Sequence, residues 1–283
     1  MSLSTGTFPG QLKTTKVKPL YKKGIETDVG NYRPVSLISV FSKIIEKIVH
    51  RRLLSLLNNC SIINKCQHGF CKGKSTNNAV VDFLNRVYKS LDDREVSMGL
   101  FLDLSKAFDS ADHEILLRKM SEMGIRGIVL KWFQSYLKNR EQRVEITYRC
   151  NETNRIINCL SGKRPIRYGV PQGSVLGPVL FLLYINDLES CIEYGKPTFF
   201  ADDTSIFISG KSVYSVQGKI NGTINKLTEW FNRNKLIINK EKTTAILFHQ
   251  PQKIHFELPL TLQRGYLNST AVSVLRYFFQ PGI

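Results

Sequence analysis

The chain has 283 residues, and its 40 Lys and Arg outnumber its 23 Asp and Glu, so the net charge is +17 at neutral pH. Hydrophobic residues make up 42% and charged residues 22%, a composition that excludes an intrinsically disordered protein and allows one large core or two packed subdomains. A charge this positive favours a polyanionic partner, with nucleic acid ahead of an acidic membrane surface.

The sequence predicts no membrane segment. The longest apolar run, 175–185, contains Gly177 and Pro178 and is too short to span a bilayer. The N-terminus lacks a charged stretch followed by an apolar block, so we expect no signal peptide. These features predict a nuclear or cytoplasmic protein with no membrane partner.

The positive charge is concentrated in the N-terminal third. Residues 1–54 carry ten Lys or Arg but only three acidic residues, and residues 47–81 contain no acidic residue at all. Surface lysines are common in any protein, but this imbalance is not. We therefore expect the N-terminal third to contact a phosphate backbone.

Residues 1–15 are polar and rich in turn formers, and we interpret them as a severed end. Hydrophobic periodicity and capping residues then predict the elements in chain order. They are a strand at 17–21, a helix at 37–58 with Phe41, Ile48 and Leu53 on one face, a helix capped by Ser75 or Thr76, a strand at 96–104, a helix from Asp112 to Gly124, a helix at 126–138, strands at 142–149, 154–160 and 164–170, a helix at 175–188, a hairpin at 197–208, a helix at 212–233 and a strand at 244–249. This order predicts an α+β fold with an antiparallel sheet and helices on one face.

The hairpin at 197–208 carries two adjacent carboxylates, Asp202 and Asp203, at its turn. In isolation such a pair is usually a solvated turn. The strand at 96–104, however, places a third carboxylate, Asp103, in an apolar environment where it needs a cation. A split β-α-β topology would bring Asp103 beside the turn. Three carboxylates there would suit Mg²⁺, and two ions about 3.5–4 Å apart would suit phosphoryl transfer.

Six short motifs occur in a characteristic order. They are Asn31-Tyr32-Arg33-Pro34, Gln67-x-Gly69-Phe70 with Ser75-Thr76, Phe101 to Asp109, Gly169-Val170-Pro171-Gln172-Gly173-Ser174, Phe200-Ala201-Asp202-Asp203 and Asn239-x-x-Lys242-Thr243. From about residue 16 to 279 the chain resembles the reverse transcriptase of non-LTR retrotransposons, most closely the jockey-like LINE group. Each motif alone is weak, but six in order are specific.

The resemblance implies a right-hand polymerase. Residues 16–94 correspond to part of the fingers, 95–250 to the palm with a finger-side insertion at about 125–170, and 251–283 to the end of the palm and the start of the primer grip. We expect the thumb and the endonuclease domain of such elements to be absent from this chain.

The resemblance also assigns roles to eight residues. Asp103, Asp202 and Asp203 correspond to the metal-binding and catalytic carboxylates, and Lys242 to a lysine that donates a proton to the leaving pyrophosphate. The substrate-binding residues are Lys22 and Arg33 for the triphosphate, Gln172 for the nascent base pair and Phe108 as the bulky residue that excludes a ribose 2′-OH. The alternatives are core packing for Phe108, a loop brace for Gln172, a surface position for Lys242 and a turn cap for Asp109.

The implied function is RNA-directed DNA polymerisation with two Mg²⁺ ions, for which Mn²⁺ could substitute. Its partners would be an RNA template, a DNA primer and dNTPs. Two alternatives remain. Cys71 stands where the family usually has Arg, and Phe278-Phe279 where Tyr-Leu-Gly usually begins the primer grip, as in a catalytically silent nucleic-acid-binding relic. An RNA-templated RNA polymerase is disfavoured by Phe108.

Overall fold

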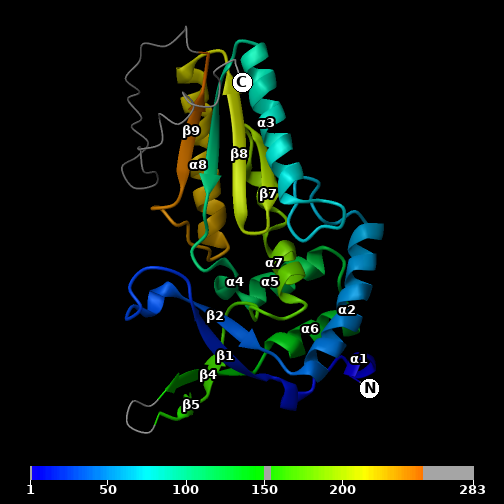
Figure 1. The fold of residues 1–283 in the computed structure, drawn as a ribbon. Coiled ribbons are helices and arrows are strands. Elements are labelled where there is room, and N and C mark those ends of the chain that lie inside the picture. The colour runs from blue at the N-terminus through cyan, green and yellow to red at the C-terminus, as the bar shows by residue number, and fades with distance from the viewer. Residues whose placement is uncertain (1, 150–153, 251–283) are drawn as a thin grey trace. The chain divides into compact units, whose positions relative to one another are not determined.

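A computed structural model describes residues 2–149 and 154–250 (Figure 1). The chain forms two compact units, each built from two separate stretches of sequence. The first unit comprises residues 1–62 and 108–184, and the second comprises residues 63–107 and the chain from 185 onward. These units are a different division from fingers and palm, whose expected boundaries stay predictions. The expectations for 251–283, including Phe278 and Phe279, lie outside the described residues.

The first unit is built on a mixed sheet in the order β2-β1-β4-β5, with β6 also paired to β4. Strands β1 and β2 are antiparallel, whereas β1 and β4 are parallel. Its elements are α1 (Ser2–Thr5), β1 (Thr14–Tyr21), β2 (Tyr32–Leu37), α2 (Val40–Asn59), α4 (Ala107–Ser110), α5 (His113–Glu122), α6 (Gly127–Leu137), β4 (Arg140–Arg149), β5 (Ile156–Leu160), β6 (Arg164–Ile166) and α7 (Gly177–Ile185), with short 3₁₀ turns at Gly10–Leu12 and Val29–Asn31.

An aromatic core holds the first unit together. Phe8 makes edge-to-face contacts with Trp132 and Tyr136, with ring centroids 5.6 and 5.1 Å apart. The guanidinium of Arg140 is buried among them, 4.9 Å from the centre of the Tyr136 ring. The polar N-terminal segment thus supplies a core residue, which its composition did not indicate.

The second unit is built on an antiparallel sheet in the order β7-β8-β3-β9. Its elements are α3 (Thr76–Asp92), β3 (Val96–Leu102), a 3₁₀ turn (Leu188–Cys191), β7 (Lys196–Phe200), β8 (Asp203–Gly210), α8 (Val213–Arg233) and β9 (Thr244–Phe248). No helix in the part of the chain that the structure describes is long and apolar enough to cross a bilayer.

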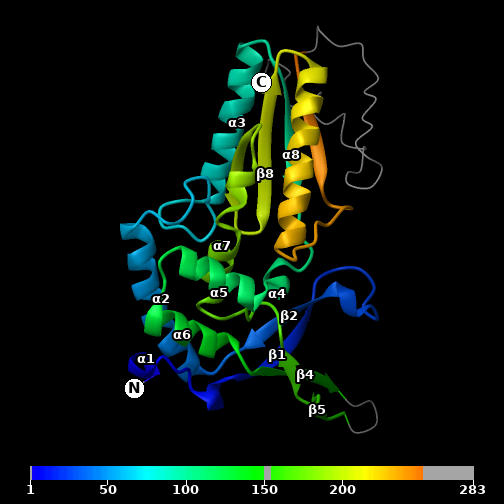
Figure 2. The same cartoon turned by 180° about the vertical axis from the view of Figure 1, so that it is seen from behind.

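Helices lie on both faces of this second sheet. Phe83 of α3 packs against Phe101, Phe207 and Phe248, with ring centroids 5.3 to 6.1 Å apart. Side chains alternate along a strand, so the buried neighbour Ile206 points to the opposite face, where α8 lies (Figure 2). The sequence predicted helices on one face only, and this detail was wrong because periodicity does not tell which face of a sheet a helix will cover.

Most predicted elements are confirmed, including the caps: the side chain of Ser75 caps α3 and that of Asp112 caps α5. Strand β2 is not among the predicted elements, and it contains Pro34, which has no N–H to donate. As an edge strand of the sheet, β2 tolerates this proline. The predicted apolar face of α2 was also wrong: Phe41 and Ile48 are exposed, and the buried side chains are Ser42, Glu46, Val49, Leu53 and Leu57.

Candidate active site

Three carboxylates gather at one end of the second sheet. The antiparallel register pairs Leu102 with Thr204, so Asp103 and Asp203 lie next to each other on neighbouring strands. Asp202 stands in the turn between β7 and β8. Desolvation raises the pKa of Asp203, and the charges of Asp202 and Asp103 raise it further. The three acids therefore repel one another.

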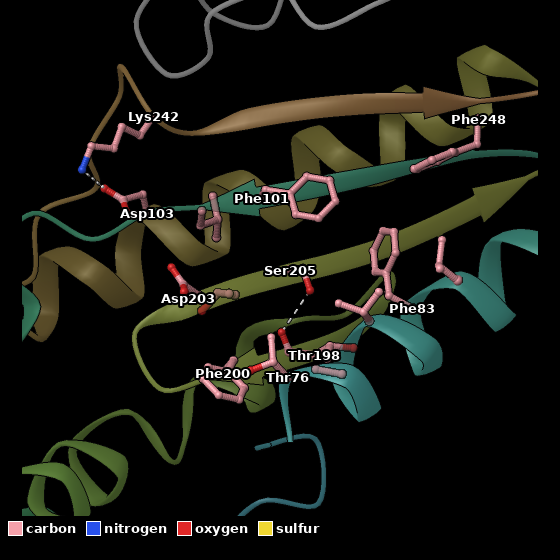
Figure 3. A pocket seen from close by; sticks show the side chains of 15 residues that line it. Thr76, Phe83, Phe101, Asp103, Thr198, Phe200, Asp203, Ser205, Lys242 and Phe248 are labelled. Carbon is pink, nitrogen blue, oxygen red and sulfur yellow. Dashed lines mark hydrogen bonds and ion pairs between the residues drawn. The ribbon is translucent and has the colours of Figure 1, made fainter. Parts of the chain in front are cut away.

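Lys242 faces the same acids. Its Nζ lies 3.3 Å from Oδ2 of Asp103, and its charge lowers the pKa of Asp203 (Figure 3). The loop that carries Lys242 also holds the main chain of Asp103: the N–H of Asn239 donates to the Asp103 carbonyl at 2.8 Å, and the N–H of Asp103 donates to Oγ1 of Thr243 at 3.4 Å. The motif Asn239-x-x-Lys242-Thr243 thus fixes both Asp103 and its cationic neighbour.

A second motif holds the turn that carries Asp202. The side chain of Gln67 is buried, and its Oε1 accepts hydrogen bonds from the N–H of Gly69 at 2.8 Å and of Ala201 at 3.0 Å. The N–H of His68 donates to the carbonyl of Phe199 at 2.7 Å, so this segment runs along β7. No role was predicted for Gln67 from the sequence, although its place in the motif was the available signal.

Gly69 allows this close approach, because a Cβ there would lie 2.3 Å from the nitrogen of Ala201. Ala201 already has a left-handed conformation, with φ of 56°. We expect Gly69→Ala to displace the turn and to reduce catalysis by at least about a hundredfold, because a shift of about 1 Å in catalytic groups has that effect. Single-nucleotide incorporation with purified variants measures it, and Gly218→Ala in α8, where a Cβ meets nothing within 4 Å, is the control for a substituted glycine of the second unit.

Asp103 and Asp203 border a pocket of about 610 Å³ within the second unit. Figure 3 shows Asp103, Asp203 and Lys242 at one end of it and Phe83, Phe101 and Phe248 toward the other. The remaining lining is mostly apolar and comes from α3, β3, β7 and β8. A polar reaction centre therefore adjoins an apolar wall.

The residues present fit a divalent cation in an open site. In the described part of the chain, no three His, Cys, Asp or Glu side chains converge to enclose an ion. Mg²⁺, however, is usually bound by one or two carboxylates together with water and substrate phosphates. The mutual repulsion that raises the pKa of Asp203 is what a cation among these oxygens would relieve.

The repulsion predicts that Asp203→Asn stabilises the metal-free protein. Because the folded-state pKa of Asp203 is raised above its ordinary value of 3.8, ionised Asp203 lowers stability at pH values above the raised pKa. Below 3.8 the carboxyl is protonated in both states, and this effect is absent. We expect a higher melting temperature for the variant at neutral pH in EDTA, and a difference that shrinks as the pH falls. A variant that melts no higher than the wild type in EDTA would contradict this expectation.

The other four predicted site residues lie in the first unit. Lys22 and Arg33 are exposed on the β1–β2 hairpin, where Leu20 pairs with Arg33 and the N–H of Lys22 donates to the carbonyl of Asn31 at 2.9 Å. The half-buried ring of Phe108 packs on Phe181, with centroids 4.6 Å apart. The hairpin thus brings two cationic side chains together.

Gln172 has a partner that the sequence did not indicate. Its Nε2 donates to both carboxylate oxygens of Asp109, at 3.0 and 3.1 Å. Because the amide nitrogen is held there, the amide oxygen faces away from Asp109, and the side chain has one defined orientation. Asp109 is therefore a neighbour of Gln172, in addition to its expected role near the turn.

A model of the family described as reverse transcriptase (RNA-dependent DNA polymerase) matches residues 20–267. The chain belongs to this family. Members of the reverse transcriptase family use divalent metal ions, as the acidic cluster indicates. All six motifs of the sequence lie within the matched residues 20–267.

Several curated relatives are proteins of mobile elements. The RNA-directed DNA polymerase from mobile element jockey of Drosophila melanogaster is 29% identical over 87% of this chain. The probable RNA-directed DNA polymerase from transposon BS of the same species is 30% identical over 83% of it. The chain spans only 26% of the length of each relative.

Solved structures show the same fold. The apo telomerase of Candida tropicalis truncated from its C-terminal domain has a TM-score of 0.58 at 14% identity and covers 84% of this chain and 50% of its own. The apo telomerase of the same species has a TM-score of 0.55 at 13% identity and covers 86% of this chain and 45% of its own. At this identity the likeness shows the fold alone.

Proposed function

We propose that the chain is the RNA-directed DNA polymerase domain of a non-LTR retrotransposon. It adds dNTPs to a primer 3′-OH as directed by an RNA template. The observation that carries the proposal is the register of β3 and β8, which places Asp103 beside Asp202 and Asp203 with Lys242 next to them, in a chain of the reverse transcriptase family.

The four residues of the second unit carry the chemistry. Asp103 and Asp202 provide ligand oxygens for two Mg²⁺ ions, and Asp203 keeps the site negative beside them. When bound, the ions lower the pKa of the primer 3′-OH and neutralise the charge on the transferring phosphoryl group. Lys242 holds a proton at Nζ, next to Asp103, and donates it to the leaving pyrophosphate.

The four residues of the first unit bind the nucleotide. Lys22 and Arg33 contact the triphosphate, for which the guanidinium fork of Arg33 is suited. Gln172, held by Asp109, contacts the nascent base pair. Phe108 occupies the space that a ribose 2′-OH would need, and Phe181 supports its ring.

The template contact rests on the basic N-terminal third. In α2, Lys47, Arg51 and Arg52 are exposed, whereas the single acid of the helix, Glu46, is fully buried. The outer surface of this helix is therefore basic without an opposing acid. Such a surface binds a phosphate backbone with an affinity that falls as salt rises.

Primer extension on poly(rA)/oligo(dT) tests the proposal. We expect incorporation of dTTP that requires Mg²⁺, is supported by Mn²⁺ and is lost in EDTA. Binding of the RNA template without extension would instead favour a catalytically silent relic. Equal use of UTP and dTTP would favour an RNA-templated RNA polymerase. The position of Phe108 against Phe181 and the acidic cluster support the expected Mg²⁺-dependent incorporation of dTTP.

A further inference from the structure

A buried carboxylate lies under the loop that carries Gln172. Glu46 of α2 is 0% exposed. One carboxylate oxygen accepts a hydrogen bond from Oγ of Ser42 at 2.8 Å, and the other accepts one from the N–H of Val175 at 2.8 Å. A buried carboxylate is costly, and the other buried side chains of α2 are one serine and three apolar residues, Ser42, Val49, Leu53 and Leu57. Its contact with the Gln172 loop therefore calls for a reason beyond packing.

We propose that Glu46 is a positioning residue for nucleotide selection. By accepting the Val175 N–H it holds the turn at 171–175, and through that turn it holds Gln172. The inference rests on the proposed role of Gln172 and deepens it. It assigns part of base discrimination to a side chain that itself touches no substrate.

The turn at 171–175 is short and closed by a hydrogen bond, so a contact at Val175 also restrains Gln172. The N–H of Ser174 donates to the carbonyl of Pro171 at 3.0 Å. On the other side, the N–H of Ser36 donates to the carbonyl of Gln172 at 2.7 Å. Gly173 has φ of 107°, and a Cβ there would lie 2.7 Å from the carbonyl oxygen of Ser36. The loop is thus held closely at both ends.

Both anchors come from one stretch of chain. Ser36 lies in β2, the strand that carries Arg33, and Glu46 lies in α2, which begins three residues after that strand ends. The segment formed by β2 and α2, which carries Arg33 for the triphosphate, therefore also contacts the loop that carries Gln172 for the base. Glu46 links these two contacts in a single rigid assembly within the first unit.

Glu46 and Arg140 both act on one buried phenol. Arg140 is 1% exposed and lies over the ring of Tyr136. Burial raises the pKa of the Tyr136 hydroxyl, the charge of Glu46 raises it further, and the charge of Arg140 lowers it. Glu46 therefore lies among buried polar groups of the first unit as well as beside the Gln172 loop.

Three substitutions separate positioning from packing. Glu46→Gln keeps an oxygen for the Val175 N–H and an amide that can donate to Ser42, so we expect wild-type behaviour within about twofold. Glu46→Asp keeps the charge but is one methylene shorter, and we expect it to lose the Val175 contact while still folding. Ser42→Ala removes the other hydrogen bond and leaves the Val175 contact, so it is the matched control.

The measurement is single-nucleotide insertion opposite a defined template base, with correct and mismatched dNTPs and with active sites titrated so that only folded enzyme is counted. For Glu46→Asp we expect the dNTP KM to rise and the discrimination between correct and mismatched dNTPs to fall, each about tenfold, as for loss of one hydrogen bond to a charged group. A loss of stability alone would leave both quantities unchanged.

Hydrogen exchange of the segment 169–177 gives a second measurement that needs no activity. We expect faster exchange there in Glu46→Asp and unchanged exchange in Glu46→Gln and Ser42→Ala. Wild-type discrimination and wild-type exchange in Glu46→Asp would overturn the inference. So would a Glu46→Gln variant as impaired as Glu46→Asp, because the hydrogen bond to Val175 would then not be sufficient for discrimination. A wild-type chain that extends no primer would instead refute the proposed function.

Discussion

Asp103→Asn and Asp202→Asn are each expected to abolish primer extension while leaving the affinity for RNA template nearly intact. Each substitution removes an anionic oxygen from the acidic cluster, where metal ions supply several kilocalories per mole of transition-state stabilisation. A loss of about 4 kcal/mol corresponds to roughly a thousandfold in rate. Template affinity depends on the basic surface of the N-terminal third, whose charge neither variant changes.

Rapid-quench incorporation of one dNTP measures the rate, and fluorescence anisotropy with labelled RNA measures the affinity. Asp92→Asn is the matched control, because this exposed acid ends α3 and belongs to no part of the cluster. We expect it to retain both properties. A comparable loss of RNA affinity in both Asp103→Asn and Asp202→Asn would refute the division between chemistry and template binding.

Phe108→Ala is expected to admit ribonucleotides. The ring of Phe108 packs on the fully buried ring of Phe181, which fixes its position, and removing it opens space where a 2′-OH would lie. Steric discrimination of this size corresponds to about 10–200-fold. We therefore expect the ratio of kcat/KM for dNTP over rNTP to fall by roughly that factor, mainly because rNTP use improves.

The matched control is Phe108→Tyr, which keeps the ring and its packing and should preserve selectivity for dNTPs. Competition between dTTP and UTP on a poly(rA) template measures the ratio in all three proteins. An active Phe108→Ala variant with unchanged selectivity would show that the ring serves only as packing against Phe181.

The acidic cluster could be predicted from the sequence because its signals are local. An Asp pair between two apolar runs predicts a hairpin, and the strand carrying Asp103 has a clear pattern of its own. The structure then pairs Leu102 with Thr204, as the split β-α-β topology requires. The proposed roles of the individual acids stay predictions.

The hydrogen bonds that hold the site residues in place could not be predicted, because each joins residues far apart in the chain. Asp109 contacts Gln172, 63 positions later, and Glu46 contacts Val175, 129 positions later. One signal was present for Glu46: it occupies a position in the stripe Ser42, Val49, Leu53 and Leu57 that is otherwise buried. A charged residue in a buried stripe of a helix predicts a specific partner, but periodicity alone does not identify it.

For the turn before Asp202, the sequence identified the motif but not the physical reason for it. The order Gln67-x-Gly69 identified a family motif, but its reason became clear only from the hydrogen bonds of Gln67 to Ala201 and the close approach of Gly69. Strand β2 was not predicted, because Pro34 disfavours a strand locally. The edge position of β2 in the sheet tolerates this proline.

The most direct test of template-directed DNA synthesis is the sequence of the product made on a heteropolymeric RNA. The chain is incubated with an RNA of defined sequence, an annealed DNA primer, four dNTPs and Mg²⁺, and the extended primers are sequenced. We predict DNA complementary to the RNA, made by the wild type and missing with Asp202→Asn or in EDTA. Extension by the Asp202→Asn variant at the wild-type rate, or products unrelated to the template, would contradict the account.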